Sequence, residues 1–260
     1  MRYVVTGMVL LFTITFMFDT SAKETKETNK NDHSIIFFGD SITDGMANDM
    51  ISWDYYMNQL NPFKKSTNAG SSGATFSNSR KINMIVTQVL NHKNEHYDYV
   101  LIQGGVNDAM DEVPIGTMND SYDPEDFDMS TFIGAVDMTL YYLTSYYNSS
   151  TLGMIITYPT PDALEHGWRG KASEPQAYYN ALKEVCEKWE VPYIDFFSGE
   201  LSTVIGEEEL LDGLHLNSQG YEKIAPYLLE FIQEVSPYHT NLKRQQEIKN
   251  SGLKYYNLTY

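Results

Sequence analysis

The chain has 260 residues, of which 42% are hydrophobic and 20% charged, and its net charge is −17 at pH 7. This length and hydrophobic content suit one globular domain with a sizeable core. The negative charge argues against a nucleic-acid partner, because phosphate binding needs clustered Lys and Arg. The acidity favours solubility and weak repulsion of anionic polymers.

Residues 1–22 have the pattern of a signal peptide. Arg2 precedes an uncharged, largely apolar run from Tyr3 to Phe18, and Thr20–Ala22 supplies small residues for cleavage. The run is shorter than the about 20 apolar residues of a bilayer span. We therefore expect no stable membrane span after processing, with an uncleaved N-terminal anchor as the alternative. The polar residues 23–33 are expected to form a disordered linker.

The only cysteine, Cys186, excludes an internal disulfide. It falls on an apolar helical face, where a buried packing role is expected rather than a reactive thiol. An exported protein with so little cysteine fits a secreted or cell-surface protein of bacteria better than a disulfide-stapled scaffold.

Five segments are predicted to be strands. The first, Ile35–Phe38, is a continuous apolar run that ends at Gly39, as expected for a strand buried on both faces of a parallel sheet. The others are Lys64–Ala69, Tyr99–Ile102, Met154–Thr157 and Val191–Phe197.

Apolar residues at helical spacing predict helices between these strands: Met50–Leu60, Ile82–Leu90, Ile133–Leu143, Tyr178–Trp189 and Tyr221–Val235. Alternating strands and helices indicate an α/β fold in which helices cover both faces of a parallel sheet. Five strands fit the flavodoxin-like order 2-1-3-4-5. We expect one domain over residues 34–236, followed by a C-terminal tail, residues 237–260, to which no role is assigned.

Ser41 directly follows the first strand, at the edge where open α/β sheets bind their ligands. Its hydroxyl would be presented on a tight strand-to-helix turn. An N-cap of the following helix is the competing interpretation, because serine is common in that position. A catalytic role therefore requires a base and donors for an oxyanion elsewhere in the chain.

His215 is the best candidate base among the six histidines. A serine hydroxyl needs such a base to act as a nucleophile at neutral pH. Asp212 lies three residues earlier in the same small loop and could hold the imidazole in the tautomer that accepts the serine proton. An ordinary loop before a capped helix is the alternative for this stretch taken alone.

Three groups at the carboxyl ends of the predicted strands could stabilise an oxyanion. They are the amide of Ser41, the amide of Gly70 and the side-chain amide of Asn107. Glycine and asparagine are also common turn residues, so neither Gly70 nor Asn107 is decisive alone. Their convergence at one edge of one sheet favours a common site.

The chain resembles the SGNH hydrolases, the GDSL esterase/lipase superfamily, in four sequence blocks that occur in the family's order. The blocks are Gly39-Asp40-Ser41-Ile42, Gly70, Gly105-Val106-Asn107-Asp108 and Asp212-Gly213-Leu214-His215. The resemblance implies a three-layer α/β/α fold, Ser41 as nucleophile, His215 as base and Asp212 as its partner. It also implies an oxyanion hole of Ser41, Gly70 and Asn107, supported by Asp40 and Asp108, and no metal or organic cofactor.

The predicted function is therefore hydrolysis of carboxylic esters through an acyl-Ser41 intermediate. Short acyl groups, such as acetyl on carbohydrates or small molecules, are favoured because no long apolar lid stands out. The alternatives are an acyltransferase, a longer-chain lipase, a flavodoxin-like phosphate or flavin binder, and a non-catalytic surface binding module.

Tyr122, Tyr158 and Trp168 are candidate cleft residues, since aromatic walls suit both sugar rings and acyl chains. The long acidic loop over residues 109–128 lacks the EF-hand pattern, so solvated carboxylates are expected there rather than bound calcium. The sequence does not indicate an oligomeric state.

Overall fold

The computed structural model describes residues 32–160 and 175–235. Several predictions lie outside these ranges: the signal peptide at 1–22, nearly all of the linker at 23–33, the candidate cleft residue Trp168, and the tail at 237–260. Among the described residues, no helix has both the length and the apolarity needed to cross a bilayer.

A five-stranded sheet forms the centre of the molecule, and each neighbouring pair of strands is parallel. The strand order β2-β1-β3-β4-β5 confirms the predicted flavodoxin-like order. The strands are β1 (Ser34–Phe38), β2 (Lys65–Asn68), β3 (Tyr99–Gln103), β4 (Thr151–Ile156) and β5 (Tyr193–Asp195). All carboxyl ends therefore meet at one edge, which is where ligands bind in such sheets.

Two strands, β4 and β5, differ from the predicted bounds by two residues or more at one end or both, and the other three differ by at most one residue at each end. β4 begins at Thr151, which pairs with Tyr99 of β3 although the segment before Met154 is not continuously apolar. β5 ends at Asp195 because its carboxylate accepts hydrogen bonds from the amides of Phe197 and Ser198, which turn the chain. Pairing partners and turn bonds of this kind are not visible in local hydropathy.

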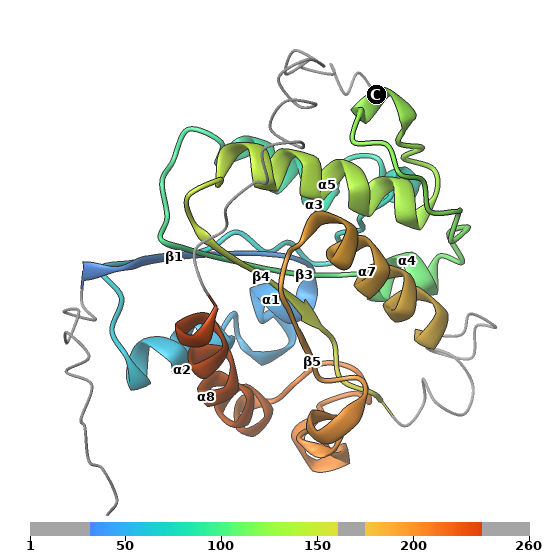
Figure 1. Cartoon of the computed structure of the whole chain (residues 1–260). Coiled ribbons are helices and arrows are strands. Elements are labelled where there is room, and N and C mark those ends of the chain that lie inside the picture. Colours follow the sequence, from blue (N-terminus) through green and yellow to red (C-terminus); the bar gives the residue numbers. More distant parts are fainter. Residues whose placement is uncertain (1–31, 161–174, 236–260) are drawn as a thin grey trace, which may run out of the picture.

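Helices cover both faces of the sheet and complete the three layers (Figure 1). One face carries α3 (Ile85–Asn91), α5 (Phe132–Tyr146) and α7 (Pro175–Trp189), and the other carries α2 (Trp53–Leu60) and α8 (Ser218–Glu234). The predicted start of α3 was three residues early. Ile82 is 93% exposed, because it lies in the turn after a 3-10 helix (Asn78–Arg80), and Met84 pairs with Thr75 in an isolated bridge before α3 begins.

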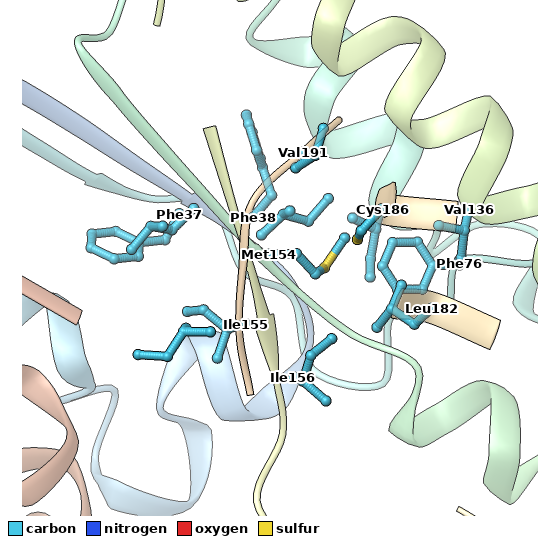
Figure 2. Close-up of a cluster of buried hydrophobic side chains, with 14 of the residues drawn as sticks. Phe37, Phe38, Phe76, Val136, Met154, Ile155, Ile156, Leu182, Cys186 and Val191 are labelled. Atoms are coloured by element: carbon cyan, nitrogen blue, oxygen red, sulfur yellow. The ribbon is translucent and has the colours of Figure 1, made fainter. Parts of the chain in front are cut away.

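Successive core side chains of each strand point to opposite faces of the sheet, as the pleat of a strand requires. Phe37 and Ile155 point to one side, whereas Phe38 and Met154 point to the other, beside Cys186 of α7 (Figure 2). Cys186 is fully buried, in agreement with the packing role expected for it, and burial raises the pKa of its thiol well above its usual value. A buried neutral thiol of this kind is a poor nucleophile.

Candidate active site

The turn after β1 presents Ser41 as the first residue of α1 (Ser41–Asp44). The N-cap of this helix is Asp40, whose side chain accepts a hydrogen bond of 2.9 Å from the Ile42 amide. Ser41 is therefore not the capping residue, and its hydroxyl is available for other contacts. Its own amide is one of the N-terminal donors that a helix leaves without an internal partner.

A chain of two hydrogen bonds connects Ser41 to Asp212 through the ring of His215. The Ser41 Oγ lies 2.9 Å from His215 Nε2, and His215 Nδ1 lies 2.9 Å from Asp212 Oδ2. A carboxylate at Nδ1 favours the tautomer with its proton on that nitrogen, which leaves Nε2 to accept the serine proton. The structure thus brings together the three residues that the sequence analysis selected, across 174 positions of the chain.

Asp212 also holds the backbone of its own loop. Its Oδ1 accepts hydrogen bonds from the amides of Leu214 (3.1 Å) and His215 (2.8 Å). Partial burial raises the pKa of the Asp212 carboxyl, but the His215 amide and ring outweigh it and leave the pKa below its ordinary value. The carboxylate therefore stays ionised and faces the imidazole at neutral pH.

Tyr158 supports the histidine loop and does not form an open cleft wall. Its hydroxyl donates a 2.7 Å hydrogen bond to the Leu214 carbonyl, next to His215, and the residue is only 2% exposed. The prediction that Tyr158 lines the cleft is corrected in this respect. The residue follows β4 and so links the sheet edge to the loop that carries His215.

Tyr122 lies at the opposite end of the sheet from Ser41. Its hydroxyl donates to the Lys188 carbonyl at 2.9 Å, and its ring centroid lies 5.0 Å from that of Trp189. Trp189 ends α7 just before β5 begins, whereas Ser41 follows the end of its strand. Tyr122 therefore packs against α7, and the prediction that it lines the cleft is wrong.

Asp40 and Asp108 are both fully buried beneath the site. Asp40 Oδ2 accepts a 3.1 Å hydrogen bond from Gln103 Nε2, and burial raises the pKa of Asp40 to about 6. Asp108 belongs to α4 (Val106–Met110) and accepts hydrogen bonds of 2.9 Å from the amides of Phe76 and Ser77. Burial also raises the pKa of the Asp108 carboxyl. Asp108 thus ties the loop after β2 to the turn after β3.

Two buried glutamines near the serine turn were not selected by the sequence analysis. Gln88 of α3 accepts from the Gly39 amide and donates to the Gly39 carbonyl, both at 2.8 Å. Gln103, the last residue of β3, accepts from the Thr43 hydroxyl at 2.8 Å while it donates to Asp40. A polar amide within an otherwise apolar helical stripe or strand was the signal that could have identified them.

The Gly70 amide is already engaged by its own turn. It donates a 3.0 Å hydrogen bond to Asn68 Oδ1, and a β-carbon at Gly70 would lie 2.7 Å from the Asp44 amide nitrogen. Gly70 is therefore the glycine that lets the turn pack against α1. This geometry does not fit the prediction of Gly70 as an oxyanion donor.

Gly73, in the same turn, was not selected from the sequence. Asn83 Nδ2 donates to the Ser72 carbonyl at 2.7 Å, and because a trans peptide is planar this bond also sets the direction of the Gly73 N–H. Within residues 32–160 and 175–235 that amide has no hydrogen-bond partner. Asn107 Nδ2, in turn, donates at 2.9 Å to the carbonyl of Ala74, the next residue. Gly73 and Asn107 are thus neighbours.

The comparisons with known proteins agree with this arrangement. Residues 37–223 match the model of the GDSL-like lipase/acylhydrolase family, which is most of the chain. The chain belongs to this family. The match confirms the resemblance to SGNH hydrolases and the predicted enzyme class, a carboxylic ester hydrolase.

Similar proteins include a multidomain esterase from Ruminococcus flavefaciens, 33% identical over 90 residues, which cover 33% of this chain and 11% of that protein. A solved structure from Lactobacillus plantarum has a TM-score of 0.64 at 22% identity, covering 78% of this chain and 97% of the other. Est24, a carbohydrate acetylesterase from Sinorhizobium meliloti, has a TM-score of 0.56 at 14% identity over 78% and 99% of the two chains. These two structures share the fold with this family member.

The described part of the chain holds no group of three or more His, Cys, Asp or Glu side chains arranged to bind a metal ion. In the acidic loop, several carboxylates have protein donors instead. Asp111 pairs with Arg80, and Asp128 accepts from the amide and hydroxyl of Ser130. The two hydrogen bonds from Ser130 lower the pKa of the Asp128 carboxyl.

Proposed function

We propose that the protein is a serine esterase that cleaves carboxylic esters through an acyl-enzyme intermediate on Ser41. The observation that carries the proposal is the hydrogen-bonded row from Ser41 Oγ through the His215 ring to Asp212, with 2.9 Å at each step. The row lies at the carboxyl edge of the parallel sheet, and Asp40 fixes the helix start that presents the serine.

In the first half of the reaction, Ser41 Oγ attacks the ester carbonyl carbon while its proton passes to His215 Nε2. Asp212 stabilises the imidazolium that forms. Collapse of the tetrahedral intermediate breaks the bond to the alkoxy oxygen, which takes the proton from Nε2 and leaves as the alcohol. In the second half, His215 takes a proton from a water molecule, and the hydroxide that remains attacks the acyl carbonyl carbon. The second tetrahedral intermediate then collapses, His215 returns the proton to Ser41 Oγ, and the carboxylic acid leaves.

The oxyanion of each tetrahedral intermediate needs preorganised donors, each worth about 10²–10³ in rate. We assign three: the Ser41 amide, the second N–H of the Asn107 side chain, and the amide of Gly73. Gly73 replaces the expected Gly70 because the Gly70 amide donates to Asn68 and the Gly73 amide is held free by the Asn83 contact to Ser72.

For the substrate, we propose short acyl groups, acetyl foremost, on a carbohydrate or another small ester. The fold that this chain shares with the carbohydrate acetylesterase Est24 is in keeping with this choice. The similar R. flavefaciens protein is also an esterase, but the match covers only 11% of its length. The predicted signal peptide adds the proposal that the enzyme acts outside a bacterial cell. Transfer of the acyl group to a sugar hydroxyl instead of water uses the same first half-reaction.

The test is hydrolysis of p-nitrophenyl acetate, butyrate and octanoate by the full chain and by Ser41→Ala. Turnover that falls at least 10³-fold in Ser41→Ala, with preference for acetate, supports the proposal. Preference for octanoate would turn the assignment towards a lipase. A rate that rises when a sugar acceptor is added, with acylated sugar as product, would indicate a transferase. Turnover that survives in Ser41→Ala would overturn the mechanism.

A further inference from the structure

Arg80 lies behind two of the assigned oxyanion donors and contacts both of their residues. Its Nη1 donates to the Gly73 carbonyl at 3.0 Å and to Asn107 Oδ1 at 3.2 Å. Arg80 ends a short 3-10 helix, Asn78–Arg80, that precedes α3, and it lies outside the four sequence blocks that carry the family resemblance. No step of the proposed reaction uses it directly.

The guanidinium is itself held by a second, two-pronged contact. Its Nε donates to Asp111 Oδ2 at 2.8 Å and its Nη2 to Asp111 Oδ1 at 2.9 Å. Such a fork geometry fixes the plane of the guanidinium as well as its position. Asp111 directly follows α4, the short helix that carries Asn107. The pair therefore ties the turn after β2 to the turn after β3.

The Arg80 contact and the Ala74 carbonyl together set which end of the Asn107 amide faces the site. A guanidinium has donors only, so it accepts no N–H and can be faced only by Oδ1. With Oδ1 turned to Arg80, Nδ2 points the other way. One of its hydrogens goes to the Ala74 carbonyl, and the second remains for an oxyanion. The reversed amide would place an acceptor against the negative oxygen.

The same Nη1 group holds the Gly73 carbonyl and so fixes the peptide plane between Gly73 and Ala74. Gly73 has φ = +78°, a left-handed conformation that glycine adopts without steric cost. Together with the Asn83 contact on the preceding peptide, this bond holds both peptide planes around the Gly73 α-carbon.

We propose that Arg80, anchored by Asp111, is a positioning residue of the oxyanion hole that sets the orientation of the Asn107 amide and the Gly73 turn. The inference rests on the proposed serine mechanism. Arg80 does not touch the substrate. It acts on the rate of the chemical step by keeping donors aimed at the place where charge develops.

The first measurement compares steady-state kinetics on p-nitrophenyl acetate for the wild type, Arg80→Met and Arg80→Lys. Loss of an aimed donor affects the transition state more than bound substrate, so kcat should fall about 10- to 100-fold in Arg80→Met with KM changed less than threefold. Arg80→Lys should recover only part of kcat, because an ammonium cannot hold Asp111, Gly73 and Asn107 together. Lys65→Met is the matched control. It breaks the exposed Lys65–Glu95 ion pair at the start of β2 and should leave kcat unchanged.

The second measurement separates positioning from a general loss of structure. Asn107→Ala alone should lower kcat about 10²–10³-fold, and Arg80→Met should lower kcat by a smaller factor in the Asn107→Ala background than in the wild type, because only the Gly73 turn is then left for Arg80 to position. A methylboronic acid, which forms a tetrahedral adduct on the serine, should bind more weakly to Arg80→Met in proportion to its loss of kcat.

Equal losses from Arg80→Met in the wild-type and Asn107→Ala backgrounds would overturn the inference, as would an unchanged kcat. These outcomes are distinct from failure of the serine mechanism itself. Turnover that survives in Ser41→Ala would overturn both, whereas Ser41-dependent turnover with independent losses would overturn only the role of Arg80.

Discussion

Gln88 binds both polar groups of the Gly39 backbone, with its Oε1 2.8 Å from the Gly39 nitrogen and its Nε2 2.8 Å from the Gly39 oxygen. The contact spans 49 positions and joins α3 to the last residue before the Asp40–Ser41 turn. The Gly39 carbonyl also accepts a 2.9 Å hydrogen bond from the Ser71 amide, on the β2 side of β1. The glutamine therefore supplies the partner of the Gly39 amide and fixes the turn that presents Ser41.

Replacing Gln88 with Leu should lower both stability and activity. The buried Gly39 amide would lose its partner, whereas the Gly39 carbonyl keeps the hydrogen bond from the Ser71 amide, so the free energy of unfolding should fall by about 1–3 kcal/mol. Urea unfolding of the wild type, Gln88→Leu and Gln176→Leu measures this. Gln176 is on the exposed surface of α7, bonded to Asn180, and its replacement should change stability by at most about 0.5 kcal/mol. Equal stability of the two variants would contradict the role of Gln88.

Asp212→Asn should leave the fold intact and lower kcat by about 10²–10⁴-fold. The amide oxygen can still accept from the Leu214 and His215 amides, but the amide nitrogen would donate to His215 Nδ1. The imidazole would then carry its proton on Nε2 and could not accept the one from Ser41. Kinetics on p-nitrophenyl acetate measures the effect, with the exposed Glu208→Gln as control. A loss smaller than tenfold would remove Asp212 from the mechanism.

Tyr158→Phe tests whether the phenol supports the histidine loop. Without the hydroxyl, the buried Leu214 carbonyl loses its 2.7 Å partner, which should cost about 1–3 kcal/mol of unfolding free energy. We expect kcat to fall less than tenfold, since Asp212 still holds His215. Tyr55→Phe serves as control because Tyr55 is 48% exposed. A variant as stable as the wild type would show that the Leu214 contact contributes little.

The buried Asp40 carboxyl should make stability fall as the pH rises. Its pKa is raised from 3.8 to about 6, mainly by burial, so the folded protein holds this proton more tightly than the unfolded chain does. The stabilisation is then present at acidic pH and is lost between about pH 4 and 6, by about 3 kcal/mol in total.

The measurement is the unfolding free energy of the wild type minus that of Asp40→Asn at several pH values from 4 to 8. Subtraction cancels the other titrating groups, and the difference should decrease with rising pH. A difference that increases with pH would mean that the Ile42 amide and Gln103 stabilise the ionised form beyond the cost of burial.

Much of the fold followed from local patterns. Continuous apolar runs such as Ile35–Phe38 and helical stripes such as Tyr178–Trp189 predicted the alternation of elements, and the alternation predicted the strand order. The row of Ser41, His215 and Asp212 was predictable too, because each residue sits next to an element end that the pattern locates. Parallel strands bring such ends to one edge whatever their separation in the chain.

Other features depended on contacts that no local pattern contains. The acidic loop could have carried Tyr122 to either end of the sheet, and only its path against Lys188 and Trp189 decided which. Gln88 and Gln103 looked like minor breaks in apolar segments, although their partners are the backbone and side chains of the serine turn.

The amino-acid sequence by itself determined the class of fold, the family and the choice of Ser41, His215 and Asp212 as the proposed nucleophile, base and carboxylate, since apolar periodicity and motif order are properties of the chain. Tertiary structure alone decided which glycine offers its amide and which way the Asn107 amide faces. The direction of an N–H is set by the plane of its peptide or amide group. Here that plane is held by Asn83 and Arg80, whose side chains reach back across the turn to Ser72, Gly73 and Asn107.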